Sequence, residues 1–90
     1  MTDNEQTEYR DIGLRLRAIR KSLGINQIKF AKALDVKQPV YWRWEVGQRR
    51  ITIECALRIK HNYGVSLDWI YDGDPHTKPK LLSGSDPNEE

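Results

Sequence analysis

The sequence predicts an all-α fold, a compact domain of five helices between about residues 10 and 73. Apolar residues recur at helical spacing, since Ile12, Leu16, Ile19 and Leu23 stand at i, i+4, i+7 and i+11. Glycines and helix-capping residues divide the chain at short intervals. No segment alternates apolar and polar residues as a strand does, and no internal repeat is present. These patterns favour a helical class with one small core.

A glycine separates the first two predicted helices. The first helix carries the stripe described above and ends at Gly24, where a C-cap glycine is expected. Asn26 can cap the second helix. The buried side of this second helix is predicted to carry Phe30, Ala31 and Leu34. The helix has to stop near Asp35, which leaves room only for a tight turn before the next one.

Three more helices are predicted after that turn. The third covers residues 38–46, and Pro39 is tolerated there because the amides of a first turn need no intrahelical acceptor. The fourth is capped by Thr52 and closed by Gly64. Its apolar stripe is expected to be Ile53, Ala56, Leu57 and Tyr63. A short fifth helix covers residues 67–71.

The two ends of the chain lack the helical pattern of the part between them. Residues 1–9 form an acidic N-terminal arm that we expect to be mobile. Residues 74–90, "DPHTKPKLLSGSDPNEE", contain three prolines and no periodicity, so they are interpreted as a mobile C-terminal tail. The predicted domain therefore spans residues 10–73.

Composition narrows the class of protein. The 90 residues are 38% apolar and 31% charged, which is ordinary for a soluble globular domain. No apolar run approaches the roughly 20 residues that cross a bilayer. The polar N-terminus has no features of a secretory signal. The single cysteine cannot form an internal disulfide. We expect a cytoplasmic protein that does not bind a membrane.

The sequence offers no pattern for catalysis, a metal or a cofactor. His61 and His76 are isolated from any cluster at metal-ligand spacing. Cys55 has no partner base in its helix and is more typical of a packed small residue than of a nucleophile. No glycine-rich loop is available to bind a phosphate group. An enzyme is not predicted.

The small net charge of +2 hides an uneven distribution. Residues 10–50 hold eleven Lys and Arg against three acidic residues, a net charge of +8. The segments on both sides of this block are net negative. A basic block of this kind indicates a polyanion-binding face, although a solvated helix surface has the same charge pattern.

The stretch "VKQPVYWRWEVGQRR", residues 36–50, combines aromatic and basic residues in one helix. Helical geometry predicts that Val36, Tyr41 and Trp44 face the core. The opposite face is predicted to carry Gln38, Pro39, Trp42 and Arg43. Two short helices joined by a tight turn inside a basic block are typical of a helix-turn-helix.

The stretch "INQIKFAKALDVKQPVYWRWEVGQRR", followed by "GVSLDWIYDG", resembles the Cro/cI-type helix-turn-helix family of phage repressors and bacterial regulators. The resemblance covers about residues 12–73. It rests on the joint spacing of Gln27, Ala31, Val36 and Glu45-x-Gly47. The chain departs from the family pattern at three positions: Asp35 replaces the turn glycine, Lys37 replaces a serine cap, and Ile51 stands where proline is common. Aspartate tolerates a left-handed conformation, so the turn should survive.

The resemblance implies a lambda-repressor-like architecture and a sequence-specific transcriptional regulator of double-stranded DNA, most simply a repressor. Such a regulator binds a palindromic operator as a homodimer, with the third helix in the major groove. The resemblance places base-reading side chains at Gln38, Pro39 and Arg43, with Trp42 beside them. Gln38 can bond adenine in a bidentate manner, and Arg43 can do so with guanine. Each of these side chains can also be a merely solvated or partner-binding residue.

Other residues are predicted to support this interface. Phosphate contacts are expected from Asn26, Gln27, Lys37, Arg49 and Arg50. The resemblance also implies a structural ion pair between Arg20 and Glu45, which would turn the carboxylate away from phosphate.

The short fifth helix has more apolar surface than we expect it to bury within one domain. Part of Trp69, Ile70 and Tyr71 is therefore predicted to form a dimer contact, against the alternative that all three belong to the monomer core. A second class of function stays open, in which the helix-turn-helix is a protein-interaction module, antitoxin-like or an adaptor, with Trp42 and Trp69 as anchors.

Overall fold

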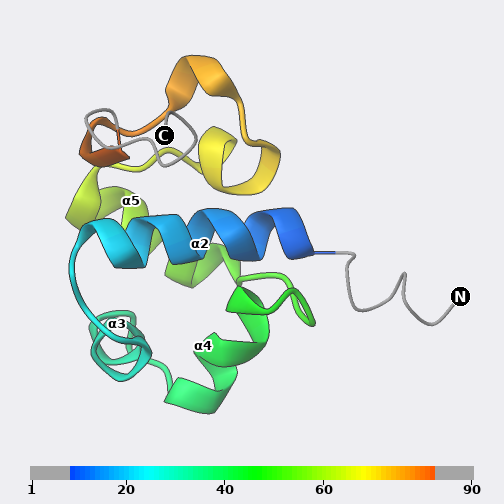
Figure 1. Cartoon of the computed structure of the whole chain (residues 1–90), viewed down its shortest axis with the longest axis vertical. Helices are drawn as coiled ribbons and strands as arrows, with labels where there is room; N and C mark the ends of the chain where they lie inside the picture. The colour runs from blue at the N-terminus through cyan, green and yellow to red at the C-terminus, as the bar shows by residue number, and fades with distance from the viewer. Residues whose placement is uncertain (1–8, 83–90) are drawn as a thin grey trace, which may run out of the picture.

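The computed structural model describes residues 9–82. Its helices run in the order α2 (Arg10–Ser22), α3 (Gln27–Ala33), α4 (Gln38–Glu45), α5 (Ile53–Tyr63), η1 (Asp68–Asp72), η2 (Pro75–Thr77) and η3 (Lys80–Leu82). Within these residues there is no strand, and the predicted all-α class is confirmed. Figure 1 shows α2 crossing the middle of the molecule, with α3 and α4 on one side and the C-terminal turns on the other.

Local sequence signals set the boundaries of these helices. The Asn26 side chain accepts a hydrogen bond from the Lys29 amide (2.9 Å), and Thr52 accepts one from the Cys55 amide (3.3 Å). Asp35 has a φ of 63°, so it supplies the left-handed residue of the turn between α3 and α4. Lys37 precedes α4 without a side-chain cap, as its substitution for serine predicts.

The core is built from buried residues of α2, α3, α4, α5, η1 and η3. Its fully buried members include Leu16, Ile19, Phe30, Leu34, Tyr41, Ile59, Val65 and Ile70. The ring of Phe30 packs edge-on against Tyr41 at 5.3 Å between centroids, which ties α3 to α4. The predicted inward residues of the first three helices are in the core, except Leu23 and Val36, which are partly buried and pack against it.

Where α2 crosses α4, a glycine allows the two backbones to touch. A Cβ atom at Gly13 would lie 2.7 Å from the Trp44 carbonyl oxygen and would also collide with the Glu45 carbonyl. Only a residue without a side chain fits this crossing. The contact with Gly13 therefore fixes the position of the C-terminal end of α4, where Glu45 lies, relative to α2.

The predicted apolar stripe of α5 is partly wrong. Ala56 is buried, but Ile53 is 56% exposed, and Leu57 and Tyr63 are only partly buried. The buried side of the helix instead carries Cys55, Ala56 and Ile59. The cap at Thr52 starts the helix at Ile53, and this first residue stands outside the side that faces the core.

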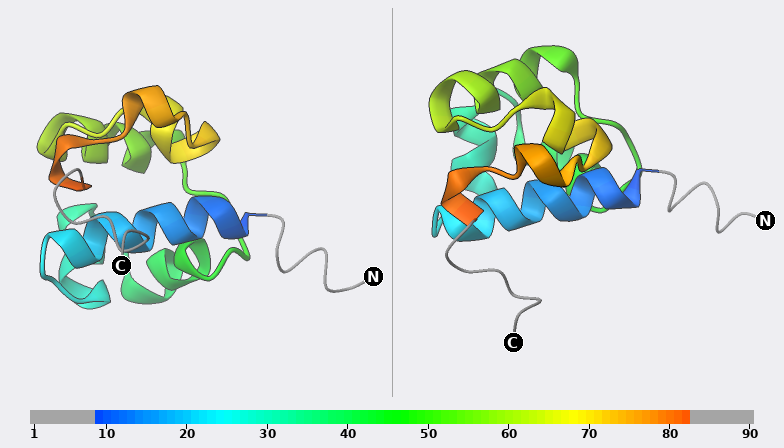
Figure 2. Two further views of the ribbon diagram at one scale, coloured as in Figure 1. Left: turned by 45° about the horizontal axis from the view of Figure 1, so that its top comes forward. Right: turned by 90° about the horizontal axis from the view of Figure 1, so that it is seen from above.

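The predicted start of the C-terminal tail is also wrong. Residues 75–77 and 80–82 form short 3₁₀ turns, and η3 packs against α2, with Pro79 and Leu82 buried. The right view of Figure 2 shows this orange segment running beside α2, which η3 contacts. Single 3₁₀ turns are too short to produce a periodic pattern, so composition alone did not reveal them. Residues 83–90 of the predicted tail and residues 1–8 of the predicted arm lie outside the described residues.

Burial leaves little of the fifth helix free for the predicted dimer contact. In η1, Trp69 is 8% exposed and Ile70 is fully buried. Tyr71 is half-buried, and its hydroxyl donates a hydrogen bond to the Ile51 carbonyl (2.8 Å). Arg15 of α2 donates to the Ile70 carbonyl (3.0 Å) and so closes the end of η1. These side chains belong to the monomer core, because α2 and the C-terminal turns cover the apolar surface that the short helix cannot hide alone.

No helix within residues 9–82 combines the length and the apolar character that crossing a membrane requires.

Candidate nucleic-acid interface

Helix α4 has one face in the core and one face in solvent. Tyr41 is fully buried and Trp44 is 4% exposed. On the opposite side, Pro39, Trp42 and Arg43 are exposed, and Gln38 at the start of the helix is partly exposed. The exposed face therefore presents an amide, a guanidinium and a large aromatic ring, which are groups that can contact base edges.

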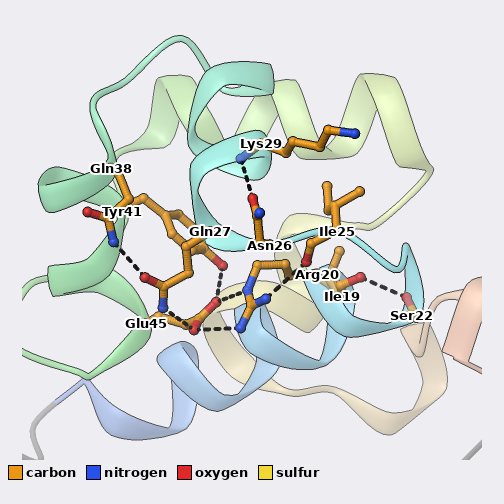
Figure 3. Close-up of polar contacts among 10 residues, drawn as sticks. All are labelled: Ile19, Arg20, Ser22, Ile25, Asn26, Gln27, Lys29, Gln38, Tyr41 and Glu45. Atoms are coloured by element: carbon orange, nitrogen blue, oxygen red, sulfur yellow. Dashed lines mark hydrogen bonds and ion pairs between the residues drawn. The ribbon is translucent and has the colours of Figure 1, made fainter.

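A buried carboxylate at the end of α4 ties three helices together. Glu45 Oε2 accepts hydrogen bonds from Arg20 Nε (2.7 Å) and from the Tyr41 hydroxyl (2.6 Å). Its Oε1 accepts from Arg20 Nη2 (3.2 Å) and from Gln27 Nε2 (2.8 Å). Figure 3 shows these contacts converging on the carboxylate. The structure thus brings Arg20 and Glu45 together, with the charge of Glu45 turned away from the exposed face.

These contacts change the acidity of the residues that make them. Burial alone raises the pKa of Glu45, but the hydrogen bonds from Arg20, Tyr41 and Gln27 outweigh it, and the pKa lies below its usual value. The pKa of Tyr41 is raised by burial and then by the hydrogen bond to Glu45. The pKa of Arg20 is raised chiefly by its hydrogen bond to Glu45. The carboxylate is therefore ionised and the phenol neutral at neutral pH.

Gln27 connects this network to the exposed face. Its side-chain oxygen accepts a hydrogen bond from Gln38 Nε2 (2.7 Å), while its amide nitrogen donates to Glu45. The contact uses one of the two Gln38 amide hydrogens. The other hydrogen and the Gln38 oxygen remain for a bidentate contact with adenine. Gln27 thus orients the side chain that was predicted to read a base.

Three arginines gather at the far end of α4. Arg43, Arg49 and Arg50 line one hollow of about 360 Å³, together with Val40, Trp44 and Thr52. Arg50 also lies over the ring of Tyr9, at 5.6 Å from its centroid, which is within the range of a cation–π contact. The sequence predicted a base contact for Arg43 and phosphate contacts for Arg49 and Arg50. In the structure, these three arginines line the same hollow and form the basic edge of α4.

A family model described as helix-turn-helix matches residues 16–70, more than half of the chain. The chain belongs to the Cro/cI-type helix-turn-helix family. Neither the curated proteins nor the solved structures gave a significant match. The matched segment contains α3, the turn at Asp35 and α4, so these elements are the helix-turn-helix of this protein.

The remaining residues predicted to contact phosphate differ in how many of their hydrogen-bonding groups are already used within the domain. The Asn26 oxygen accepts the hydrogen bond that caps α3, and the amide nitrogen of its side chain is the donor that remains for a phosphate. The Gln27 side chain donates one amide hydrogen to Glu45 and accepts a hydrogen bond from Gln38, so its second amide hydrogen and its backbone amide remain for the predicted phosphate contact. Lys37 is exposed beside Lys32 at the turn.

Sequence reasoning missed two basic residues near the helix-turn-helix. Arg10 and Arg17 of α2 line a hollow that also includes Gln27. The signal in the sequence was weak, because these residues belong to the basic block but stand before the motif. Tyr41 was predicted as a core residue, and its hydroxyl contact with Glu45 was also missed.

Proposed function

We propose that this helix-turn-helix protein is a sequence-specific transcriptional repressor that binds double-stranded DNA through α4. The observation that supports this most is the orientation of Gln38, which Gln27 holds at the exposed start of α4. A side chain fixed before binding loses less conformational entropy when it contacts a base. Arg43, exposed on the same helix, is the second base-reading residue in this proposal.

The spacing of these two residues supports contact with different base pairs. Gln38 and Arg43 are five residues apart, so they flank a strip about 140° wide on the helix surface. With the start of α4 directed into the major groove, Gln38 addresses adenine and Arg43 addresses guanine. Arg49, Arg50 and Lys37 then lie beside the groove, where they contact phosphates and supply salt-dependent affinity.

The proposal includes a homodimer on a palindromic operator in the cytoplasm of a bacterial or phage-infected cell. Each protomer carries one helix-turn-helix, and a two-fold pair reads two half-sites about one helical turn apart. The contact between protomers is not assigned to Trp69, Ile70 or Tyr71, since burial leaves them little free surface.

The alternative is a protein-interaction module. Trp42 is 41% exposed on α4, and an exposed tryptophan is a typical anchor of protein interfaces. The second anchor expected for this function, Trp69, is buried, so only one of the two anchors remains. The paired glutamines and the basic edge of α4 favour DNA over a protein partner.

Selection of bound duplexes from a random pool tests the proposed function. A repressor of this kind should enrich one palindromic sequence. Enrichment of no sequence, together with weak binding to all duplexes, would support the protein-interaction module instead.

Two arginine variants then separate sequence choice from affinity. Arg43→Ala should lower the ratio of operator affinity to affinity for scrambled DNA, by ~1–3 kcal/mol for each half-site. Arg50→Ala should weaken binding to both duplexes alike and lower the salt slope by about one unit per contact. If the two variants exchange these behaviours, the assignment of base and phosphate contacts is wrong.

A further inference from the structure

A basic hollow beside the helix-turn-helix is not used by the contacts assigned above. It has a volume of about 510 Å³ and is lined by Arg10, Leu14 and Arg17 of α2, with Gln27, Val46 and the Arg20–Glu45 ion pair completing its wall. Arg10, Leu14 and Arg17 stand at i, i+4 and i+7, so they share one side of α2. Leu14 is 47% exposed and Val46 is 39% exposed.

The hollow is strongly positive. Its one carboxylate, Glu45, is already neutralised by Arg20 and is 4% exposed at its side chain. Arg10 and Arg17 form no ion pair with any acidic side chain of residues 9–82. Two guanidinium groups that have no carboxylate partner within residues 9–82 raise the local potential and attract an anion.

The hollow is continuous with the proposed DNA-binding face. Gln27 is common to both, since it contacts Gln38 on one side and lines the hollow on the other. Figure 3 shows Gln38 and Arg20 at opposite ends of the network that joins them through Gln27 and Glu45. A DNA strand that passes the start of α3 therefore approaches the side of α2 that carries Arg17 and Arg10.

We propose that Arg10 and Arg17 bind DNA phosphates beyond those contacted by the helix-turn-helix, so that α2 widens the footprint of each protomer. The exposed Leu14 and Val46 offer apolar surface to the sugars between these phosphates. This inference rests on the proposed DNA-binding function and adds a second set of backbone contacts to it. Because the contacts are to phosphate, they carry affinity and no base preference.

The test uses the Arg10→Ala/Arg17→Ala double variant, each single variant and a matched control. Lys60→Ala is the control for the single variants. Lys60 is exposed near the end of α5, and its substitution also removes one positive charge. Binding is measured at several salt concentrations to the selected operator and to an unrelated duplex. Each arginine variant should lower the salt slope by about one unit per protomer on both duplexes, and Lys60→Ala should leave it unchanged.

The position of the contacts is tested with operators of increasing flank length. Wild-type protein should gain affinity when the flanks are extended, and the double variant should gain none. Replacing single flanking phosphates by neutral methylphosphonates should weaken the wild type and leave the double variant unaffected.

The outcomes separate this inference from the proposed function. If wild-type protein selects no operator but binds the unrelated duplex, the repressor proposal fails and the arginines are still tested on that duplex. If the double variant binds both duplexes with wild-type affinity and salt slope, α2 contacts no DNA and the inference is overturned. Binding of poly-L-glutamate that the double variant loses, with DNA binding intact, would overturn it in favour of an acidic polypeptide partner.

Discussion

At the scale of single residues, Glu45 explains how an acidic residue can belong to the helix that we propose binds DNA. Its side chain is 4% exposed and accepts hydrogen bonds from Arg20, Tyr41 and Gln27. An unpaired carboxylate on the exposed face would repel the DNA backbone. Here the negative charge of the carboxylate is balanced by Arg20 inside the domain. Through its hydrogen bond with Gln27, Glu45 also helps to position Gln38.

Glu45→Gln should destabilise the domain. The substitution keeps the size of the side chain but leaves the largely buried guanidinium of Arg20 without an opposite charge. Removing one partner of a buried ion pair costs ~3–5 kcal/mol, which corresponds to a decrease in Tm of more than about 10 °C for a domain of this size. Thermal and urea unfolding measure the effect. Glu54→Gln is the control, since Glu54 is exposed, and an equal effect of the two variants would contradict this role for Glu45.

The same residue predicts how stability depends on pH. The pKa of Glu45 in the folded state lies below its usual value of 4.5, so its contribution is fully present above pH 4.5. This contribution is lost as pH falls through the lowered pKa of the folded state. Wild-type stability should therefore decrease more steeply than that of Glu45→Gln below about pH 4.5. Urea unfolding between pH 3 and pH 7 tests this, and parallel curves for the two proteins would refute it.

At the scale of elements, α2 packs against two groups of helices, one on each side. One side contacts α4, with Gly13 at the closest approach, and another side packs against η1 and η3. The C-terminal turns therefore complete the core on the side of α2 away from α3 and α4 (Figure 2). Loosening them should affect α4 only through α2.

Leu82→Ala tests the contribution of the C-terminal turns. Leu82 is 7% exposed and belongs to the core, so its truncation should lower the free energy of unfolding by ~2 kcal/mol, at the low end for a buried leucine. Leu14→Ala is the matched control, because Leu14 is 47% exposed and should change stability by less than ~0.5 kcal/mol. Chemical denaturation compares them. Equal stabilities would show that η3 does not support the core.

At the scale of the whole molecule, the parts predicted from sequence are those that local rules determine. Helical spacing, the caps at Asn26 and Thr52 and the turn at Asp35 depend on neighbouring residues, and each lies where it was predicted. The structure of residues 75–82 depends on contact with α2, which no local pattern encodes. For the same reason, local patterns left open how much of Trp69, Ile70 and Tyr71 is buried.

The candidate site divides in the same way. The outward face of α4 follows from helical periodicity, and the pairing of Arg20 with Glu45 followed only from the resemblance. The bond from Gln38 to Gln27 and the hollow beside Arg17 require the relative placement of three helices. Sequence therefore predicts which residues of α4 face outward, and the structure shows which of them contact one another or line the same hollow.

The dimensions of the molecule predict cooperative binding to DNA. The domain measures 36 × 28 × 23 Å, while half-sites one helical turn apart are separated by about 34–36 Å. Two copies on one face of the duplex are therefore close enough to touch. Because Trp69 and Ile70 are buried and leave little free surface for the predicted dimer contact, we expect monomers in free solution and cooperative pairing on the operator. Sedimentation of the free protein and titration of the operator measure the two states.

Changing the half-site spacing tests this pairing without changing the protein. An insert of about 5 base pairs places the second half-site about half a turn around the helix and moves it further away. The two copies then cannot touch, so binding should become non-cooperative while each half-site keeps its own affinity. A single half-site duplex is the control for that affinity. Cooperativity that persists with the insert would show that the protomers are joined by a flexible connection or associate before they bind.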